Sequence, residues 1–464
     1  MNWEFLTGLP ESVWPAIPGR GADLVLALMF QLQYSERLAP AELARRQQAQ
    51  LDLLLRHAWD SVPFYREYWR ETSGGQAPSG ATLHRLPSIA RSHLQQRFTD
   101  FHSRALPASH GAVSESRTSG STGAPVRVLK TELDHLFWRA LTLRDHIWHK
   151  RDLSGKLAVI RHAVDRQAAD NWGTATAGLV RTGPAVSLHV RTEISEQLDW
   201  LRAERPKYLL TYPSSAAELA LAARRRGVRL EGLAEIRTLG ELLPPETREV
   251  VQEVFGVPVK DVYSSDEAGY MALECPVTGR YHVQSENIVL EVVRENGAPC
   301  APGEVGRVLV TGLHSYAMPL VRYEIGDYAE MGEAGEVCAC GRSLPTLNRI
   351  IGRARNALRT ADGGRFFPAF GLRGQRETAK ILQFQMVQKR FDLLEARLVV
   401  VAPLDAAEEA VLRKLILGRV PPGFSLVFSY PERLERGPGG KFEEMLMELP
   451  VEPPSDSDPD PRMS

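Results

Sequence analysis

The chain lacks the features that define several large classes of protein. Its 464 residues include only four cysteines, too few for a disulfide scaffold in a chain of this length. The N-terminal run MNWEFLTGLPESVWP has no positively charged leader, so we expect no secretory signal. The apolar run at 22–34 is far shorter than a membrane span and predicts a buried or interfacial helix. A membrane-contacting helix is the alternative. We therefore expect a cytoplasmic protein without a transmembrane segment.

The net charge and the missing catalytic motifs exclude further classes of protein. The formal net charge is −1, which gives no overall field for nucleic acid or an anionic membrane. The basic run at 223–229 ends an expected helix, so a solvated helix end is favoured over an anion-binding patch. The sequence contains no HExxH, GxSxG or GxGxxG motif, which leaves little support for the enzymes that use them. The oligomeric state stays open.

What is present is the composition of a soluble globular protein, with 43% apolar and 24% charged residues. The length suits a large domain followed by a small one. The first hundred residues predict helices. Beyond residue 155, short apolar strands alternate with helices bounded by proline, serine and glycine. The expected strands are 157–161, 208–213, 236–240 and 257–263, and the expected helices are 214–227 and 244–256. This alternation predicts an α/β fold whose ligands lie at the carboxyl ends of parallel strands.

The second half of the chain has a different pattern of expected secondary structure. Residues 287–313 predict a strand–turn–strand unit, expected to form a hairpin or a small barrel-like part. After Gly352 the pattern is strand, helix, strand, which predicts a small C-terminal α/β lobe. The final residues are acidic, proline-rich and nearly devoid of apolar side chains, so we expect disorder. The expected division is an N-terminal nucleotide-binding domain over 1–352, a mobile lobe over 353–450 and a tail over 451–464.

A glycine- and hydroxyl-rich run is the first candidate for a binding loop. It reads Thr118, Ser119, Gly120, Ser121, Thr122, Gly123, Ala124, Pro125. Its glycines let backbone N–H groups approach an anion, and its hydroxyls add donors, so the run can wrap a polyphosphate. It is not a Walker A loop, because no Gly-Lys-Ser/Thr follows the glycines. A flexible surface turn is the alternative.

This run resembles the ATP-phosphate loop of the adenylate-forming superfamily, which includes acyl-CoA synthetases, luciferases and nonribosomal peptide adenylation domains. Further matches follow in the family's order: the adenine-contacting Gly240-Glu241, the motif Tyr263-Ser264-Ser265-Asp266-Glu267, the motif Tyr323-Glu324-Ile325-Gly326-Asp327, the hinge-opening Gly352-Arg353 and a lysine, Lys441. The segments SVPFYREYW, MPLVRYEIGD and CACGRSLP resemble the phenylacetate–CoA ligase-like branch, including CapK-type proteins. The resemblance spans roughly residues 40 to 445. It implies binding of ATP through these residues, including Arg353.

The resemblance also implies individual roles. Lys441 would stabilise the negative charge that grows as a carboxylate attacks the α-phosphate. Glu267 would hold Mg²⁺ between phosphates, because hard cations prefer carboxylate oxygen. Asp327, expected just beyond a strand, would accept hydrogen bonds from the ribose hydroxyls, and Tyr263 would lie against adenine. Arg322 would reach a phosphate or brace the Asp327 loop. The alternatives are that Lys441 and Glu267 are ordinary exposed side chains. Asp327 would then be a turn residue and Tyr263 part of the core.

Three positions depart from the family pattern. Ser264 stands where the family has glycine, and Asp266 stands where it has a hydroxyl residue. An extra carboxylate at Asp266 would add a metal ligand or repel the α-phosphate. In the family the small lobe rotates about a hinge between the two half-reactions, and the hinge residue is aspartate or lysine where this chain has Asn356. These departures leave the second half-reaction and the substrate range open.

A second cluster suits a metal. Cys275, His282, Cys338 and Cys340 supply three thiols and one imidazole, which is a ligand set for a structural, tetrahedral Zn²⁺. Some members of the phenylacetate–CoA ligase-like branch carry zinc in this region. The alternative is four reduced residues, some of them buried. Cys300 lies outside the cluster and is expected to be a free thiol.

The leading functional hypothesis is activation of a small carboxylic acid by ATP as an acyl-adenylate, followed by transfer to coenzyme A. The branch suggests an aromatic acid, but no residue defines the substrate. A second hypothesis keeps adenylation and transfers the acyl group to an amine, a hydroxyl or a carrier protein. A third is a catalytically impaired nucleotide-binding scaffold.

Overall fold

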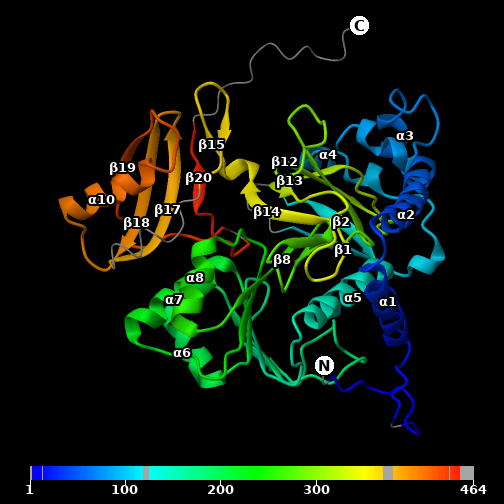
Figure 1. The fold of residues 1–464 in the computed structure, drawn as a ribbon, viewed down its shortest axis with the longest axis horizontal. Coiled ribbons are helices and arrows are strands. Elements are labelled where there is room, and N and C mark those ends of the chain that lie inside the picture. The colour runs from blue at the N-terminus through cyan, green and yellow to red at the C-terminus, as the bar shows by residue number, and fades with distance from the viewer. Residues whose placement is uncertain (1–2, 13, 119–124, 369–379, 438, 450–464) are drawn as a thin grey trace. The chain divides into compact units, whose positions relative to one another are not determined.

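The computed structural model describes residues 3–12, 14–118, 125–368, 380–437 and 439–449 (Figure 1). The predictions for the loop residues Ser119, Gly120, Ser121, Thr122 and Gly123, and for the tail 451–464, lie outside these ranges. The chain divides into two compact units. The larger comprises Met1–Gly352 together with Arg436–Lys441, and the smaller comprises Arg353–Glu435 together with Phe442–Ser464.

Helices dominate the first hundred described residues, as the sequence predicts. They are α1 (Ala22–Ser35), α2 (Pro40–Ser61), α3 (Pro63–Tyr68) and α4 (Arg91–Gln96), with a short 3₁₀ turn (Gly80–Arg85) between α3 and α4. The apolar run identified in the sequence forms α1, which packs with α5 (Glu132–Trp148). One face of α1 is buried through Val25, Met29 and Leu32, whereas Phe30 is 73% exposed. Within the described residues, no helix combines the length and apolarity needed to cross a membrane.

A twelve-stranded mixed sheet forms the centre of the larger unit. The expected parallel part is confirmed: β3 (Leu157–Arg161) pairs with β5 (Ala185–His189) and β6 (Tyr208–Thr211), then β7 (Glu235–Leu239) and β8 (Val259–Ser265) follow, all parallel. Helices α6 (Ile194–Glu204), α7 (Pro213–Arg226) and α8 (Pro245–Phe255) connect these strands and lie side by side (Figure 1). The carboxyl ends of β3, β5, β6, β7 and β8 therefore share one edge of the sheet.

The ends of α7 illustrate how far local sequence determines a helix. The predicted stop is present, because Gly227 closes the helix in the left-handed region at φ 63°. The predicted serine cap is wrong. The helix begins at Pro213, its N-cap is Tyr212, and no side chain caps the first turn. Proline at the first helical position has no N–H to satisfy, which removes part of the need for a capping side chain.

The strands beyond β8 run antiparallel and continue the same sheet. They are β9 (Gly269–Glu274), β10 (Tyr281–Val283), β11 (Ile288–Val293), β12 (Val305–Gly312), β13 (Tyr323–Met331) and β14 (Thr346–Arg353). The expected hairpin is β11 with β12. The expected barrel-like part does not close, because the described sheet runs in open order from β11 at one edge to β4 (Gln167–Ala169) at the other. The apolar faces of β11 and β12 instead pack into the core beneath the N-terminal helices.

One acidic group lies deep in this sheet. Asp261 of β8 is 3% exposed and accepts hydrogen bonds from the hydroxyls of Thr238, at 2.6 Å, and Tyr281, at 2.8 Å. Burial disfavours the charged carboxylate and raises the pKa of Asp261 to about 6, although these two hydroxyls oppose the shift.

The smaller unit contains the strand–helix–strand pattern predicted from its sequence. Its four strands lie in the order β19 (Ser425–Ser429), β18 (Leu393–Val400), β17 (Ile381–Arg390) and β20 (Met445–Met447), with α10 (Ala406–Leu417) beside them. Leu394 and Leu398 of β18 pack with Leu412 and Ile416 of α10 to form a separate core. A two-stranded ribbon, β15 (Leu358–Arg359) with β16 (Arg365–Phe366), completes the unit's described strands.

Candidate active site

The carboxyl edge of the parallel strands gathers several residues that the sequence singled out. Gly240 and Glu241 follow β7 directly, Ser264 and Ser265 end β8, and Asp266 and Glu267 come next in the chain. Because β7 and β8 are parallel neighbours, their carboxyl ends are adjacent. The register between β8 and β9 shifts at Tyr263 and Ser264, and Ser265 Oγ accepts a hydrogen bond from the N–H of Ala268 at 3.0 Å. Ser264 therefore sits at an irregularity where β8 turns into the acidic segment.

Tyr263 and Asp327 meet although 64 positions separate them in the sequence. The hydroxyl of Tyr263 donates to Asp327 Oδ2 at 2.8 Å, and the tyrosine is only 7% exposed. Asp327 was expected just beyond a strand, but it lies inside β13. There the pairing with β12 jumps from Glu324 to Tyr328, and Gly326 has φ 85°. This bulge takes Asp327 out of the regular ladder, where its carboxylate is available to the tyrosine.

Two cations flank Glu267 at the base of the predicted phosphate loop. Lys130 donates to the carbonyl oxygen of Glu267 at 2.5 Å, and Arg91 Nη1 lies 3.7 Å from Glu267 Oε1. Arg91 also donates to Thr118 Oγ1 at 3.3 Å. Thr118 belongs to the loop and pairs with Val126 across its two ends, at 2.9 Å in both directions. Burial lowers the pKa of Lys130, while the carboxylates of Asp134, Glu267 and Asp266 oppose that shift.

Lys441 lies against Gly240. A β-carbon placed on Gly240 would stand 3.3 Å from Cε and 3.4 Å from Nζ of Lys441, and Gly240 itself has φ 79°. The lysine loop is held by Arg436, which donates to Ser214 Oγ at 2.8 Å and pairs with Glu218 at 3.2 Å and Glu241 at 3.8 Å. Residues 436–441 thus pack within the larger unit.

Arg322 is held away from solvent by protein groups. Its backbone is in the left-handed region at φ 50°, and its side chain contacts Glu291 at 3.1 Å and the carbonyl of His84 at 3.1 Å. A further hydrogen bond goes to the carbonyl of Leu86. These contacts tie β13 to the N-terminal helical region, so of the two roles expected for Arg322 we carry forward bracing of the Asp327 segment.

The predicted hinge lies at the boundary between the two units. Gly352 ends the first segment of the larger unit and Arg353 begins the smaller one. Arg353 is also the last residue of β14, and Asn356 ends the short 3₁₀ turn that follows. Arg355 in that turn pairs with Glu443 at 2.5 Å inside the smaller unit. The role expected for Arg353 toward the nucleotide stays a prediction.

The predicted zinc ligands do come together. The donor atoms of Cys275, His282, Cys338 and Cys340 all lie within 4.8 Å of one another. Cys275 Sγ is 3.8 Å from Cys338 Sγ, and Cys340 Sγ is 3.3 Å from His282 Nε2. A tetrahedral zinc with bonds of about 2.3 Å to sulfur and 2.0–2.1 Å to nitrogen would separate ligand atoms by roughly 3.5–3.8 Å. The four donor atoms therefore lie close enough to share one metal ion, and the separation of the two thiols at 3.8 Å matches that of zinc-bound sulfurs.

The groups around this cluster also suit zinc. His282 Nδ1 contacts the carbonyl of Leu344 at 3.2 Å, which leaves Nε2 directed at the thiols. Cys338 starts a tight turn in which its N–H donates to Arg342 and its carbonyl accepts from Gly341. Gly341 has φ 79°, a conformation that glycine adopts without strain. Burial lowers the pKa of His282, although its contact with Leu344 opposes the shift.

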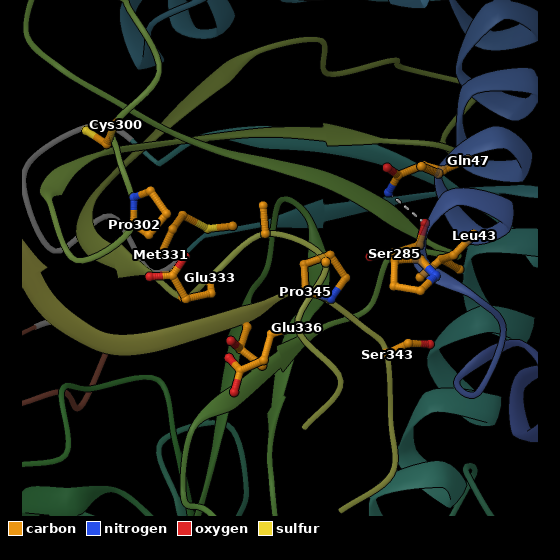
Figure 2. A pocket seen from close by; sticks show the side chains of 16 residues that line it. Leu43, Gln47, Ser285, Cys300, Pro302, Met331, Glu333, Glu336, Ser343 and Pro345 are labelled. Atoms are coloured by element: carbon orange, nitrogen blue, oxygen red, sulfur yellow. Dashed lines mark hydrogen bonds between the residues drawn. The ribbon is translucent and has the colours of Figure 1, made fainter. Parts of the chain in front are cut away.

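A separate pocket of about 330 Å³ lies beside α2, between Leu43 and Gln47 on one side and Cys300, Pro302 and Met331 on the other (Figure 2). The amide of Gln47 donates to the carbonyl of Ser285 at 2.9 Å. Cys300 is half-buried and unpaired with another cysteine, as expected, and burial raises its pKa. The lining contains none of the residues predicted to bind nucleotide or metal.

Sequence reasoning missed Arg91, Lys130 and Arg436. Arg91 lies 29 positions before Gly120 and Lys130 seven after Gly123, both outside the motif, and the only signal was that no basic residue stands between Arg117 and Arg127. Arg436 carried a weak signal, since it lies five residues before Lys441 in a glycine-rich stretch.

Comparison with known proteins places this geometry in a class. The chain has the fold of an adenylate-forming ligase: it superposes on a crystal structure of 2-hydroxyisobutyryl-CoA ligase in the postadenylation state with a TM-score of 0.71, at 19% identity, over 89% of this chain and 91% of that one. Among curated proteins it is similar to a phenylacetate-coenzyme A ligase of Thermus thermophilus, 29% identical over 348 residues, which is 71% of this chain and 74% of the relative. It is also similar to protein CapK of Staphylococcus aureus, 24% identical over 205 residues and 43% of each chain. No protein-family model matches the chain. The resemblance inferred from the motifs, to the phenylacetate–CoA ligase-like and CapK-type branch, is thereby confirmed.

Proposed function

We propose that the protein activates a carboxylic acid with ATP, releases pyrophosphate, and transfers the acyl group from the adenylate to coenzyme A. The observation that carries the proposal is the position of Lys441 against Gly240, at the sheet edge that also carries Glu241 and Glu267. The similarity to a phenylacetate-coenzyme A ligase supports coenzyme A as the acceptor.

The chemistry follows from this arrangement. A carboxylate oxygen of the acid attacks the α-phosphorus of ATP, the bond to the bridging oxygen of the β-phosphate breaks, and pyrophosphate leaves with that electron pair. The ammonium of Lys441 would stabilise the negative charge that develops on the α-phosphate oxygens. The thiolate of coenzyme A then attacks the carbonyl carbon, AMP leaves with the C–O electron pair, and the thioester forms.

The remaining predicted residues would bind and orient ATP. Glu267 is the carboxylate proposed to hold Mg²⁺, which neutralises phosphate charge when bound. Lys130 fixes the backbone of Glu267, and Arg91 sits beside its carboxylate. Asp327 would accept hydrogen bonds from the ribose hydroxyls, while the hydroxyl of Tyr263 donates to its Oδ2.

An exchange assay tests the proposal. Purified protein is incubated with ATP, labelled pyrophosphate and one acid at a time, with and without coenzyme A. We expect exchange that depends on the acid, and AMP formation with a thioester product when coenzyme A is present. Exchange without thioester would move the acceptor to an amine, a hydroxyl or a carrier protein. Nucleotide binding with no exchange for any acid would instead favour a scaffold.

We also propose that Cys275, His282, Cys338 and Cys340 bind one structural zinc. The support is the gathering of their four donor atoms within 4.8 Å of one another and the contact that orients His282. Metal analysis of purified protein should give about one zinc per chain. Cys338→Ser should lower that content and the melting temperature, whereas Cys300→Ser should change neither. A protein that is fully folded without zinc would contradict the proposal.

A further inference from the structure

Arg161 presents a cation without a partner at the same edge of the sheet. It is the last residue of β3, is half-buried, and stands in register with His189 of β5. Its Nε is buried and has no hydrogen-bond partner, and no carboxylate among the described residues forms an ion pair with its guanidinium. A buried N–H without a partner is costly, and the rest of this half-buried guanidinium has no carboxylate beside it, so the position suits an anion supplied from outside the protein.

His162 follows Arg161 and lies toward the loop that carries Lys441. Its Nδ1 is buried without a hydrogen-bond partner among the described residues, and its ring lies 5.3 Å from that of His189. Burial lowers the pKa of His162, with help from the charges of His189 and Arg191, so the imidazole is neutral near pH 7. A neutral imidazole can still donate or accept one hydrogen bond.

His162 also adjoins the residue that precedes Lys441. A β-carbon on Gly440 would stand 2.6 Å from Cβ of His162, so the backbone next to Lys441 packs directly on the histidine. The side chain of Tyr212, which follows β6, lies near both Gly240 and His162. A β-carbon on Gly240 would stand 3.6 Å from its Cε1, and its hydroxyl lies 3.5 Å from the backbone nitrogen of His162. His162 is therefore a neighbour of the proposed reaction centre, and Arg161 precedes it at the carboxyl end of β3.

We infer that the acid activated here carries a second anionic group, as a dicarboxylic acid does, and that Arg161 binds that group while the first carboxylate reacts. The inference rests on the proposed adenylation. It adds a second charge to the acid suggested by the branch, because an acid without one would leave Arg161 Nε and His162 Nδ1 buried and unpaired. Arg161 is thus a specificity-determining residue rather than part of the bond-making step.

A phosphate of ATP is the other anion that could occupy this position, since phosphate and carboxylate both suit a guanidinium. The two sources predict different kinetics. A ligand of the acid changes the KM for that acid alone, and only for acids with the second charge. A phosphate ligand changes the KM for ATP with every acid.

The test is pyrophosphate exchange with pairs of acids of equal length, such as succinate with butyrate and adipate with hexanoate, plus phthalate with benzoate and phenylacetate alone. Wild type is compared with Arg161→Gln, with Arg161→Lys as the conservative variant. Arg166→Gln is the matched control, because Arg166 is 66% exposed and pairs with Glu196 at 3.5 Å. Melting temperatures show whether each variant folds.

We expect wild type to prefer one dicarboxylate over its monoacid partner by at least about 10-fold in kcat/KM. Arg161→Gln should lose about 10- to 150-fold with that dicarboxylate, the cost of one charge-assisted hydrogen bond. It should change little with the monoacid, and Arg161→Lys should recover part of the loss. Equal use of both acids by wild type, or a raised KM for ATP with every acid in Arg161→Gln, would overturn the inference and leave adenylation standing. If none of the acids supported pyrophosphate exchange, both this inference and the proposed adenylation would be overturned.

Discussion

Replacing Arg436 should uncouple the two half-reactions. This arginine is the anchor of the loop that carries Lys441: it pairs with Glu218 and Glu241 and donates to Ser214. The three charged side chains are only 8–13% exposed, so the pairs are shielded from solvent. Arg436→Met keeps the bulk of the side chain and removes the charge.

The magnitude follows from what is left behind. Removing one partner of a buried ion pair costs about 3–5 kcal/mol, since the remaining charge is stranded. When the loop detaches, water reaches Glu218 and Glu241 and relieves part of that cost. If about 2 kcal/mol falls on docking, roughly 30-fold fewer molecules hold Lys441 in place. Adenylation should fall by about that factor.

The assay separates the steps. Pyrophosphate exchange reports adenylation, and a single turnover of synthetic acyl-adenylate with coenzyme A reports thioester formation. We expect Arg436→Met to slow the first and spare the second. Arg433→Met is the matched control, because Arg433 is 81% exposed and, among the described residues, pairs only with Glu435 in the smaller unit. Equal slowing of both steps, or undiminished exchange with an unchanged melting temperature, would refute the reasoning.

Three further outcomes are expected. Lys441→Ala should lower kcat of adenylation by about 10²- to 10³-fold with little change in ATP binding, by analogy with loss of one charge-stabilising donor; undiminished exchange would remove Lys441 from that role. Lys130→Met should raise the KM for Mg-ATP about 10-fold while Lys130→Arg recovers part of it, because the Glu267 backbone loses its donor; an unchanged KM would contradict this. Asp261 has a folded pKa of about 6, against 3.8 when unfolded, so its stabilising contribution is full below about pH 3.8 and is lost as pH rises through 6, a change of roughly 3 kcal/mol. Denaturant unfolding of Asp261→Asn between pH 4 and 7 should therefore show a flatter stability curve than wild type, and identical curves would refute the assignment.

The parallel half of the fold could be predicted from the sequence because its signals are local. A run such as 157–161 is short, apolar and bounded by turn residues, and the structure has β3 there. Gly227 and Gly256 mark the ends of α7 and α8 in the left-handed conformation that glycine tolerates. The order of the motifs then identified the superfamily, which no single motif did.

The contacts across the site could not be predicted in the same way. Tyr263 reaches Asp327 over 64 positions through a bulge in β13, and pairing irregularities depend on packing rather than on local composition. The role of Arg436 depends on its ion pairs with two acidic residues some two hundred positions earlier, which local sequence does not show. The failed barrel expectation has a similar cause, because the alternation in 287–313 describes strands but not the partner at the sheet's edge.

The division of the chain has a consequence for how the protein is made. The larger unit includes Arg436–Lys441, yet the 83 residues Arg353–Glu435 of the smaller unit separate Gly352 from Arg436. At roughly 5–20 residues per second on the ribosome, the first segment waits about 4 to 17 seconds for its last piece. Throughout that interval the nascent core can assemble, but the lysine proposed to drive catalysis has not yet been synthesised. The order of translation alone thus delays chemical competence until the smaller unit's main sequence is complete.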